Sequence, residues 1–169
     1  MTTRRASPAP SGGYSYRPPN PTIVQRALKR LWNNPPKDFS SVGSLGCIAV
    51  SIYHEARNQP IAGQAAVATV ILNRAANPER WGGTPCGVVQ PVQFSYLRPD
   101  RSFAPITNLS SWNEALEIAA EVLKRGPDPK LEGADHYHAT YVNPPWNQKM
   151  DWIAQIKDHI FWRSRPTPL

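Results

Sequence analysis

The strongest constraint on this chain is a helical period of apolar residues that begins at residue 45. These residues recur at spacings of three and four, which places them on one face of an α-helix. They are Leu45, Ile48, Ala49, Ile52 and Ala56. Pro60 interrupts the pattern, and a second helical stretch runs over about 61–74. That stretch is rich in alanine and glycine, which lets another backbone approach closely.

The later elements are predicted from shorter signals. Ser111 and Glu114 have the spacing of a capping box, so we expect a helix over 111–125. Residues 136–142 alternate and predict a short strand. Apolar residues from Met150 to Ile160 recur at helical spacing, so we expect a helix over 147–161. Residues 77–107 are interrupted by prolines and predict a long, irregular and functional region. The sum is an α-dominated α+β domain with a small β element.

Charge divides the chain into two regions. The net charge is +7, and residues 1–40 supply +6 of it, whereas residues 41–169 supply +1. Residues 1–21 are rich in proline and predict a disordered or extended segment. Residues 22–32 predict a short helix that either packs on the domain or docks elsewhere, for example on a membrane surface. We expect a basic leader over 1–40 and a catalytic domain over 41–165.

Composition excludes several classes of protein. A hydrophobic content of 40% with six tryptophans excludes a wholly disordered chain. No apolar run approaches the roughly 18 residues of a membrane span, and no secretory signal is expected because no apolar stretch follows Arg4 and Arg5. Two cysteines exclude a disulfide scaffold and a four-cysteine zinc module.

Glu55 is the first candidate for chemistry. At 100° per residue it lies about 20° from Ile48 and about 60° from Ile52, at the edge of the apolar stripe. Its carboxylate would be partly desolvated and close to the negative end of the helix dipole. Both effects raise its pKa, as a general acid near neutral pH requires. The alternative is an ordinary glutamate paired with Arg57 or Arg74.

Other residue pairs leave alternatives open. His136 and His138 could share a face of a strand, as in some zinc sites, but a third ligand and an HExxH pair are missing, so we expect no metal and no cofactor. Cys47 and Cys86 could close a loop of about 40 residues by a disulfide or remain two buried thiols. Aromatic residues such as Tyr96 are dense in the loops and suit stacking on sugar rings as well as packing.

Several blocks of sequence together resemble one family. They are Ile-Tyr-His-Glu-Ala-Arg-Asn-Gln-Pro at 52–60, Gly-Gln-Ala-Ala-Val-Ala at 63–68, Val-Ile-Leu-Asn-Arg at 70–74, Cys-Gly-Val-Val at 86–89, Gln-Phe-Ser at 93–95 and His-Tyr-His-Ala-Thr-Tyr-Val-Asn-Pro at 136–144, with Trp146. Over residues 44–163 the chain resembles the cell-wall hydrolases of the spore-cortex-lytic enzyme SleB. The resemblance implies a lysozyme-like, resuscitation-factor-like fold that cleaves the β-1,4 bond from N-acetylmuramic acid to N-acetylglucosamine, as a lytic transglycosylase.

The resemblance also implies roles for particular residues. Glu55 becomes the catalytic acid, and Cys47 and Cys86 become a disulfide. The implied sugar-cleft residues are Gln93, Ser95, Tyr96, Tyr137, His138 and Asn73, with an internal hydrogen bond as the alternative for Asn73. Family members often have Gly-Glu where this chain has Asn58 and Gln59, so a second nearby carboxylate is missing.

Four functions follow from these observations, in descending order. A lytic transglycosylase needs one carboxylate, whereas a hydrolytic muramidase needs a second one, for which Asp100 and Asp135 are candidates. A wall-binding or virion component would not cleave. Specific nucleic-acid binding through the leader is ranked last, because a basic tail without an aromatic groove is a weak signal.

The expected partners and location follow from the same resemblance. Peptidoglycan glycan strands are the expected substrate, and virion tail proteins are the expected partners of residues 1–40. Activity on a wall without an export signal suggests a phage endolysin or a virion lysin that acts in the host periplasm or cell wall.

Overall fold

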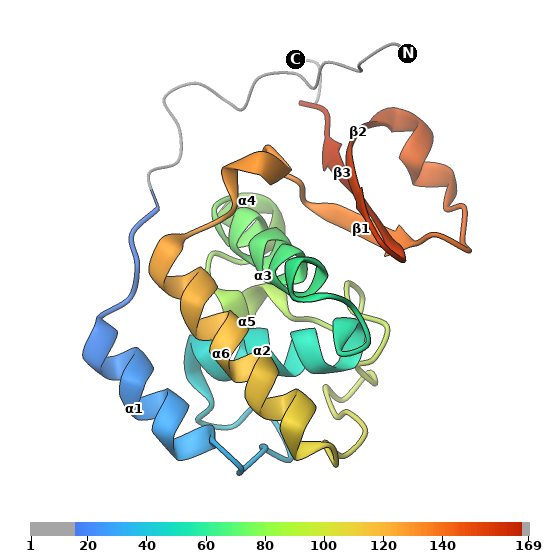
Figure 1. Ribbon diagram of the computed structural model, residues 1–169. Helices are drawn as coiled ribbons and strands as arrows, with labels where there is room; N and C mark the ends of the chain where they lie inside the picture. The colour runs from blue at the N-terminus through green and yellow to red at the C-terminus, as the bar shows by residue number, and fades with distance from the viewer. Residues whose placement is uncertain (1–15, 167–169) are drawn as a thin grey trace.

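Helix α2 (Gly43–Ala56) is the centre of the fold, and helices α1, α3, α5 and α6 pack around it. The computed structural model describes residues 16–166. The remaining elements are α1 (Pro21–Leu31), α3 (Ile61–Ala75), α4 (Pro78–Trp81), α5 (Pro85–Val88), α6 (Leu109–Arg125), the 3₁₀ turns η1 (Pro129–Leu131) and η2 (Pro145–Lys149), and the strands β1 (His136–Ala139), β2 (Met150–Ile156) and β3 (His159–Ser164). Figure 1 shows the sheet at one end of the helical body, beside α3 and α4.

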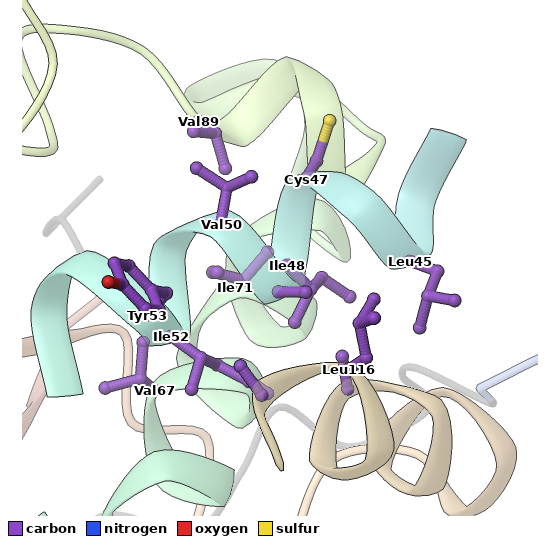
Figure 2. Packing of buried hydrophobic residues seen from close by; sticks show 14 of the residues in the cluster. Leu45, Cys47, Ile48, Val50, Ile52, Tyr53, Val67, Ile71, Val89 and Leu116 are labelled. Atoms are coloured by element: carbon purple, nitrogen blue, oxygen red, sulfur yellow. The ribbon is translucent and has the colours of Figure 1, made fainter. Parts of the chain in front are cut away.

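The core forms on all sides of α2. Every residue from Leu45 to Tyr53 is buried, as expected of a helix that is apolar around most of its circumference. Figure 2 shows Ile48 facing Leu116 of α6, while Val50 lies toward Val89. The helices predicted over 45–56 and 61–74 are therefore present, with α2 as a core helix.

A disulfide joins α2 to the segment that follows α3. Cys47 and Cys86 are bonded, with their Cα atoms 5.3 Å apart and a sequence separation of 39. Cys86 lies in α5, one of two short helices within the region expected to be irregular. The bond therefore fixes the start of the long loop region to the central helix.

The capping box predicted for α6 is wrong. The helix begins at Leu109, and the side chain of Asn108 caps it by accepting from the Ser111 N–H at 3.0 Å. Glu114 instead accepts from the Gln64 side-chain amide at 2.7 Å. The two residues with capping-box spacing lie inside the first turns, because an asparagine three residues earlier already satisfies the free N–H.

Helix α1 is present as predicted over 22–32, and it packs on the domain. Leu31 is 4% exposed, and its carbonyl accepts from the Trp112 indole N–H at 2.7 Å. The Tyr16 hydroxyl donates to the Leu123 carbonyl at 2.7 Å. Ala27 and Leu31 of α1 thus belong to the core cluster, while a domain boundary near residue 40 stays a prediction. The prediction for residues 1–15 lies outside the described residues.

The three strands form an antiparallel sheet in the order β1-β3-β2. The strand predicted over 136–142 is present but ends at Ala139. The helix predicted over 147–161 is wrong, because this segment forms η2 and the β2–β3 hairpin. Phe161 faces α3 and forms a second small core with Ala66 and Val70. No helix within residues 16–166 is long and apolar enough to cross a membrane.

Candidate active site

Four polar side chains from four segments come together beside the last turn of α2. Glu55 is half-buried there and interacts electrostatically with Arg74 of α3. Burial chiefly, and the Glu55 carboxylate in addition, raises the pKa of Tyr137 on β1 and of Tyr96 in the loop after α5. Helices, loop and sheet therefore all contribute to one site around Glu55.

The carboxyl group of Glu55 has the pKa of a general acid. Burial raises this pKa from 4.5 to about 7, and the positive charge of Arg74 partly opposes the rise. Arg57 does not pair with it, since its guanidinium donates to the Tyr53 carbonyl at 3.0 Å and lies over the Tyr53 ring. Within residues 16–166 no salt bridge holds Glu55. The group can therefore give and take a proton near neutral pH.

Tyr96 is held in place from α2. Its hydroxyl shares a 2.7 Å hydrogen bond with Ser51, one helical turn before Glu55. Its ring stacks on His54 with centroids 4.8 Å apart. Burial raises the pKa of Tyr96, its hydrogen bond with Ser51 lowers the pKa in part, and the nearby Glu55 raises it further, so the phenol keeps its proton. Of the residues implied by the Gln-Phe-Ser region, Tyr96 is the one that reaches the site.

Tyr137 and His138 lie on opposite faces of the sheet, because successive strand residues alternate. Tyr137 packs on Phe161 with ring centroids 5.6 Å apart, on the face toward the helices. His138 packs instead against Trp146 at 5.5 Å and Trp162 at 6.0 Å. The structure thus brings Tyr137, but not His138, to Glu55.

For the other implied residues, a role in the sugar cleft stays a prediction. Gln93 and Ser95 are exposed in the turns on either side of the buried Phe94. The Asn73 amide donates to the Ala134 carbonyl at 2.8 Å, which joins α3 to the segment before β1. Asn73 therefore has the internal hydrogen bond that was its alternative role.

Neither candidate second carboxylate acts on Glu55. Asp135 accepts from the Ser164 N–H at 2.9 Å and from the Ser164 hydroxyl at 2.5 Å, and its side chain bonds the His136 ring at 2.9 Å. Burial alone raises the pKa of Asp135, but these hydrogen bonds outweigh it and leave the pKa below its ordinary value. Asp100 lies exposed in a turn, where it accepts from the Ser102 N–H at 2.9 Å.

Sequence reasoning missed part of the site. Arg74 is expected from sequence only as an ion-pair partner, yet it is buried between Trp81 and Glu55. Ser51 carried no signal, apart from its position four residues before Glu55 on the same helix. Within the described residues no group of three or more histidine, cysteine, aspartate or glutamate side chains is arranged to hold a metal ion.

The helical body, the small antiparallel sheet and the half-buried glutamate define a helix-rich, lysozyme-like domain. The chain belongs to the cell wall hydrolase family, whose model matches residues 58–162. The matched range begins three residues after Glu55.

Among curated relatives, the spore cortex-lytic enzyme of Bacillus subtilis is 30% identical over 129 residues, which cover 76% of this chain and 40% of that protein. The spore cortex-lytic enzyme of Oceanobacillus iheyensis is 30% identical over 131 residues, 76% and 44% of the two chains. This chain therefore spans about two-fifths of the length of the curated relatives it matches.

Two solved structures have the same fold. One is the catalytic domain of the germination-specific lytic transglycosylase SleB from Bacillus anthracis, at a TM-score of 0.55 and 26% identity over 76% of this chain and 99% of that chain. The other is the catalytic domain of the Bacillus cereus SleB protein, with the same score and identity over 76% and 94% of the two chains. The part of the relatives that this chain matches in structure is thus a catalytic domain.

Proposed function

We propose that this domain cleaves the β-1,4 bond between N-acetylmuramic acid and N-acetylglucosamine in peptidoglycan as a lytic transglycosylase. The observation that carries the proposal is the half-buried Glu55, whose pKa is raised to about 7 in the chain's catalytic-domain fold. The related structure described as a lytic transglycosylase supports the reaction class.

The environment of Glu55 favours a mechanism with one carboxylate. Arg74 is the charged residue that acts on Glu55, and no described carboxylate does. The Asp135 carboxylate is hydrogen-bonded to Ser164 and His136, and the Asp100 carboxylate is hydrogen-bonded within its own turn. A hydrolysing glycosidase uses two carboxylates on either side of the scissile bond. The single acid therefore supports transglycosylation over hydrolysis by a muramidase.

The reaction would use Glu55 twice. Protonated Glu55 gives its proton to the glycosidic oxygen as the bond from C1 to that oxygen breaks. The resulting carboxylate takes the proton from the C6 hydroxyl of the same muramic acid, and O6 then bonds C1 to form the 1,6-anhydro sugar. Tyr137 keeps its proton, so its hydroxyl can donate a hydrogen bond from the site, whereas the Tyr96 hydroxyl donates to Ser51.

Digestion of purified peptidoglycan followed by mass spectrometry tests this proposal. The wild-type protein is expected to release muropeptides with anhydro ends, while Glu55→Gln releases none. Products with only reducing ends would identify a muramidase. A protein that binds the wall but clears no zymogram would be a wall-binding or structural component.

Delivery by a phage, as an endolysin or virion lysin, stays a prediction from sequence. Docking to virion proteins through residues 1–40 also stays a prediction, and the packing of α1 limits how much of that segment is available for it. Detection of the protein in purified particles would support the virion route.

A further inference from the structure

Arg74 is a buried cation with an unused hydrogen-bond donor. Its side chain is 5% exposed, and its Nε–H donates to the Asp135 carbonyl at 2.7 Å. The guanidinium carbon lies 4.3 Å from the centre of the Trp81 ring and 5.7 Å from that of Phe94. Its Nη1 is buried and has no hydrogen-bond partner among the described residues. The ring contacts and the bond to Asp135 thus fix the guanidinium and leave Nη1 free.

A fixed, unsatisfied donor on a buried charge costs stability, so it needs an explanation. The groups whose charges act on Arg74 are Tyr137, Asp135, Arg80 and Glu55. The Asp135 carboxylate is already bonded to Ser164 and His136, and Tyr137 keeps its proton. Glu55 is the acid of this group whose charge changes during the proposed reaction.

We propose that Arg74 is a positioning residue that stabilises the carboxylate form of Glu55 between its two proton transfers. This inference rests on the proposed function. When Glu55 has protonated the leaving oxygen, it becomes an anion in a half-buried site, and Arg74 offers the compensating charge and a free N–H. A carboxylate stabilised in this way keeps its orientation until it takes the proton from the C6 hydroxyl.

The other titratable groups near Glu55 do not supply that charge. Tyr96 and Tyr137 are neutral because burial raises their pKa. Burial, with a smaller effect of Arg57, lowers the pKa of His54 to about 4, so this ring is neutral in the range where Glu55 titrates. Arg74 therefore provides the positive charge that opposes the effect of burial on Glu55.

Arg80 provides a matched control. Its guanidinium carbon lies 4.5 Å from the centre of the same Trp81 ring, and it donates to the Ser164 hydroxyl at 2.9 Å. Arg80 is exposed and is not among the groups that shift the pKa of Glu55. Removal of either arginine costs a contact with Trp81, but only removal of Arg74 should change Glu55.

The test is an NMR titration of Glu55 in the full chain without substrate. The pKa of Glu55 is measured in the wild type and in Arg74→Gln, Arg74→Lys and Arg80→Gln. Arg74→Gln keeps a donor for the Asp135 carbonyl and removes the charge, so the Glu55 pKa is expected to rise above about 7. Arg74→Lys keeps the charge, so the Glu55 pKa should stay at about 7. In Arg80→Gln the Glu55 pKa should match that of the wild type.

Turnover of peptidoglycan gives the second measurement. For Arg74→Gln we expect the alkaline limb of the pH–rate profile to move up with the Glu55 pKa, and the maximal rate to fall tenfold or more. An unchanged Glu55 pKa in folded Arg74→Gln would overturn the inference, as would an equal change in Arg80→Gln. If Arg74→Gln does not fold, Arg74→Met is measured in its place. A wild-type protein that cleaves nothing contradicts the proposed function, whereas the NMR titration still decides the role of Arg74.

Discussion

Substitution of Glu55 by glutamine should stabilise this protein above pH 4.5, and the gain should be complete above about pH 7. Burial raises the pKa of Glu55 from 4.5 to about 7, which makes the ionised form about 3 kcal/mol less favourable in the folded state at most. Below pH 4.5 the group is protonated in both states and carries no such penalty. The wild type therefore loses free energy of unfolding as the pH rises from 4.5 through about 7.

The expected difference can be measured by urea unfolding at pH 4 and pH 8.5. Because Glu55 is half-buried, solvent screening reduces the penalty. We expect the free energy of unfolding of Glu55→Gln, relative to that of the wild type, to be higher at pH 8.5 than at pH 4 by about 2–3 kcal/mol. In thermal unfolding this corresponds to roughly 5–10 °C for a domain of this size. Other titrating groups contribute equally to both proteins and cancel in the comparison.

The matched control is Glu117→Gln, at an exposed glutamate on α6. Glu117→Gln should change the free energy of unfolding by the same small amount at pH 4 and pH 8.5. The reasoning would be refuted if Glu55→Gln differed from the wild type by the same amount at pH 4 and pH 8.5. It would also be refuted if Glu117→Gln reproduced the pH-dependent gain, because that gain would not come from burial of Glu55.

Three further predictions concern the fold. Replacement of Cys47 and Cys86 by serine should lower the free energy of unfolding by about 3–4 kcal/mol in denaturant titrations, because the disulfide closes a loop of 39 residues. Leu31→Ala should cost about 2–4 kcal/mol in the same assay if α1 is part of the core, and a cost near zero would contradict this. Burial lowers the pKa of His54 to about 4, so the neutral ring contributes stability that is lost as the pH falls from about 6.5 toward 4. His54→Gln lacks this loss, so its melting temperature relative to that of the wild type should rise as the pH falls over that range.

The helices of the core could be predicted because their signals are local. The period of α2 and the position of Glu55 at its edge are both readable from spacing alone. Partial burial of Glu55 near the end of that helix then gives the direction of its pKa shift, which is raised as expected.

The β2–β3 hairpin could not be predicted in the same way. A bulge between Trp152 and Ala154 breaks the alternation of β2, so that Ile153 and Ile156 have a helical spacing although they lie in a strand. The turn depends on Lys157, whose φ of 48° is uncommon for a residue other than glycine. Neither feature has a clear mark in the sequence.

The rest of the site depends on contacts between distant segments. Arg74 meets Glu55 only after α3 packs on α2, and Tyr137 reaches it only when the sheet docks on α3. The opposite placement of His138 follows from the alternation of β1, once it is known which face of the sheet is turned toward the helices.

Analysis of the products from purified peptidoglycan tests the central claim most directly. The wild-type protein should give muropeptides that end in 1,6-anhydro-N-acetylmuramic acid, and Glu55→Gln, although folded and more stable at pH 8.5, should give none. Reducing ends from the wild type, or anhydro ends from Glu55→Gln, would contradict a mechanism in which Glu55 alone serves as acid and then as base.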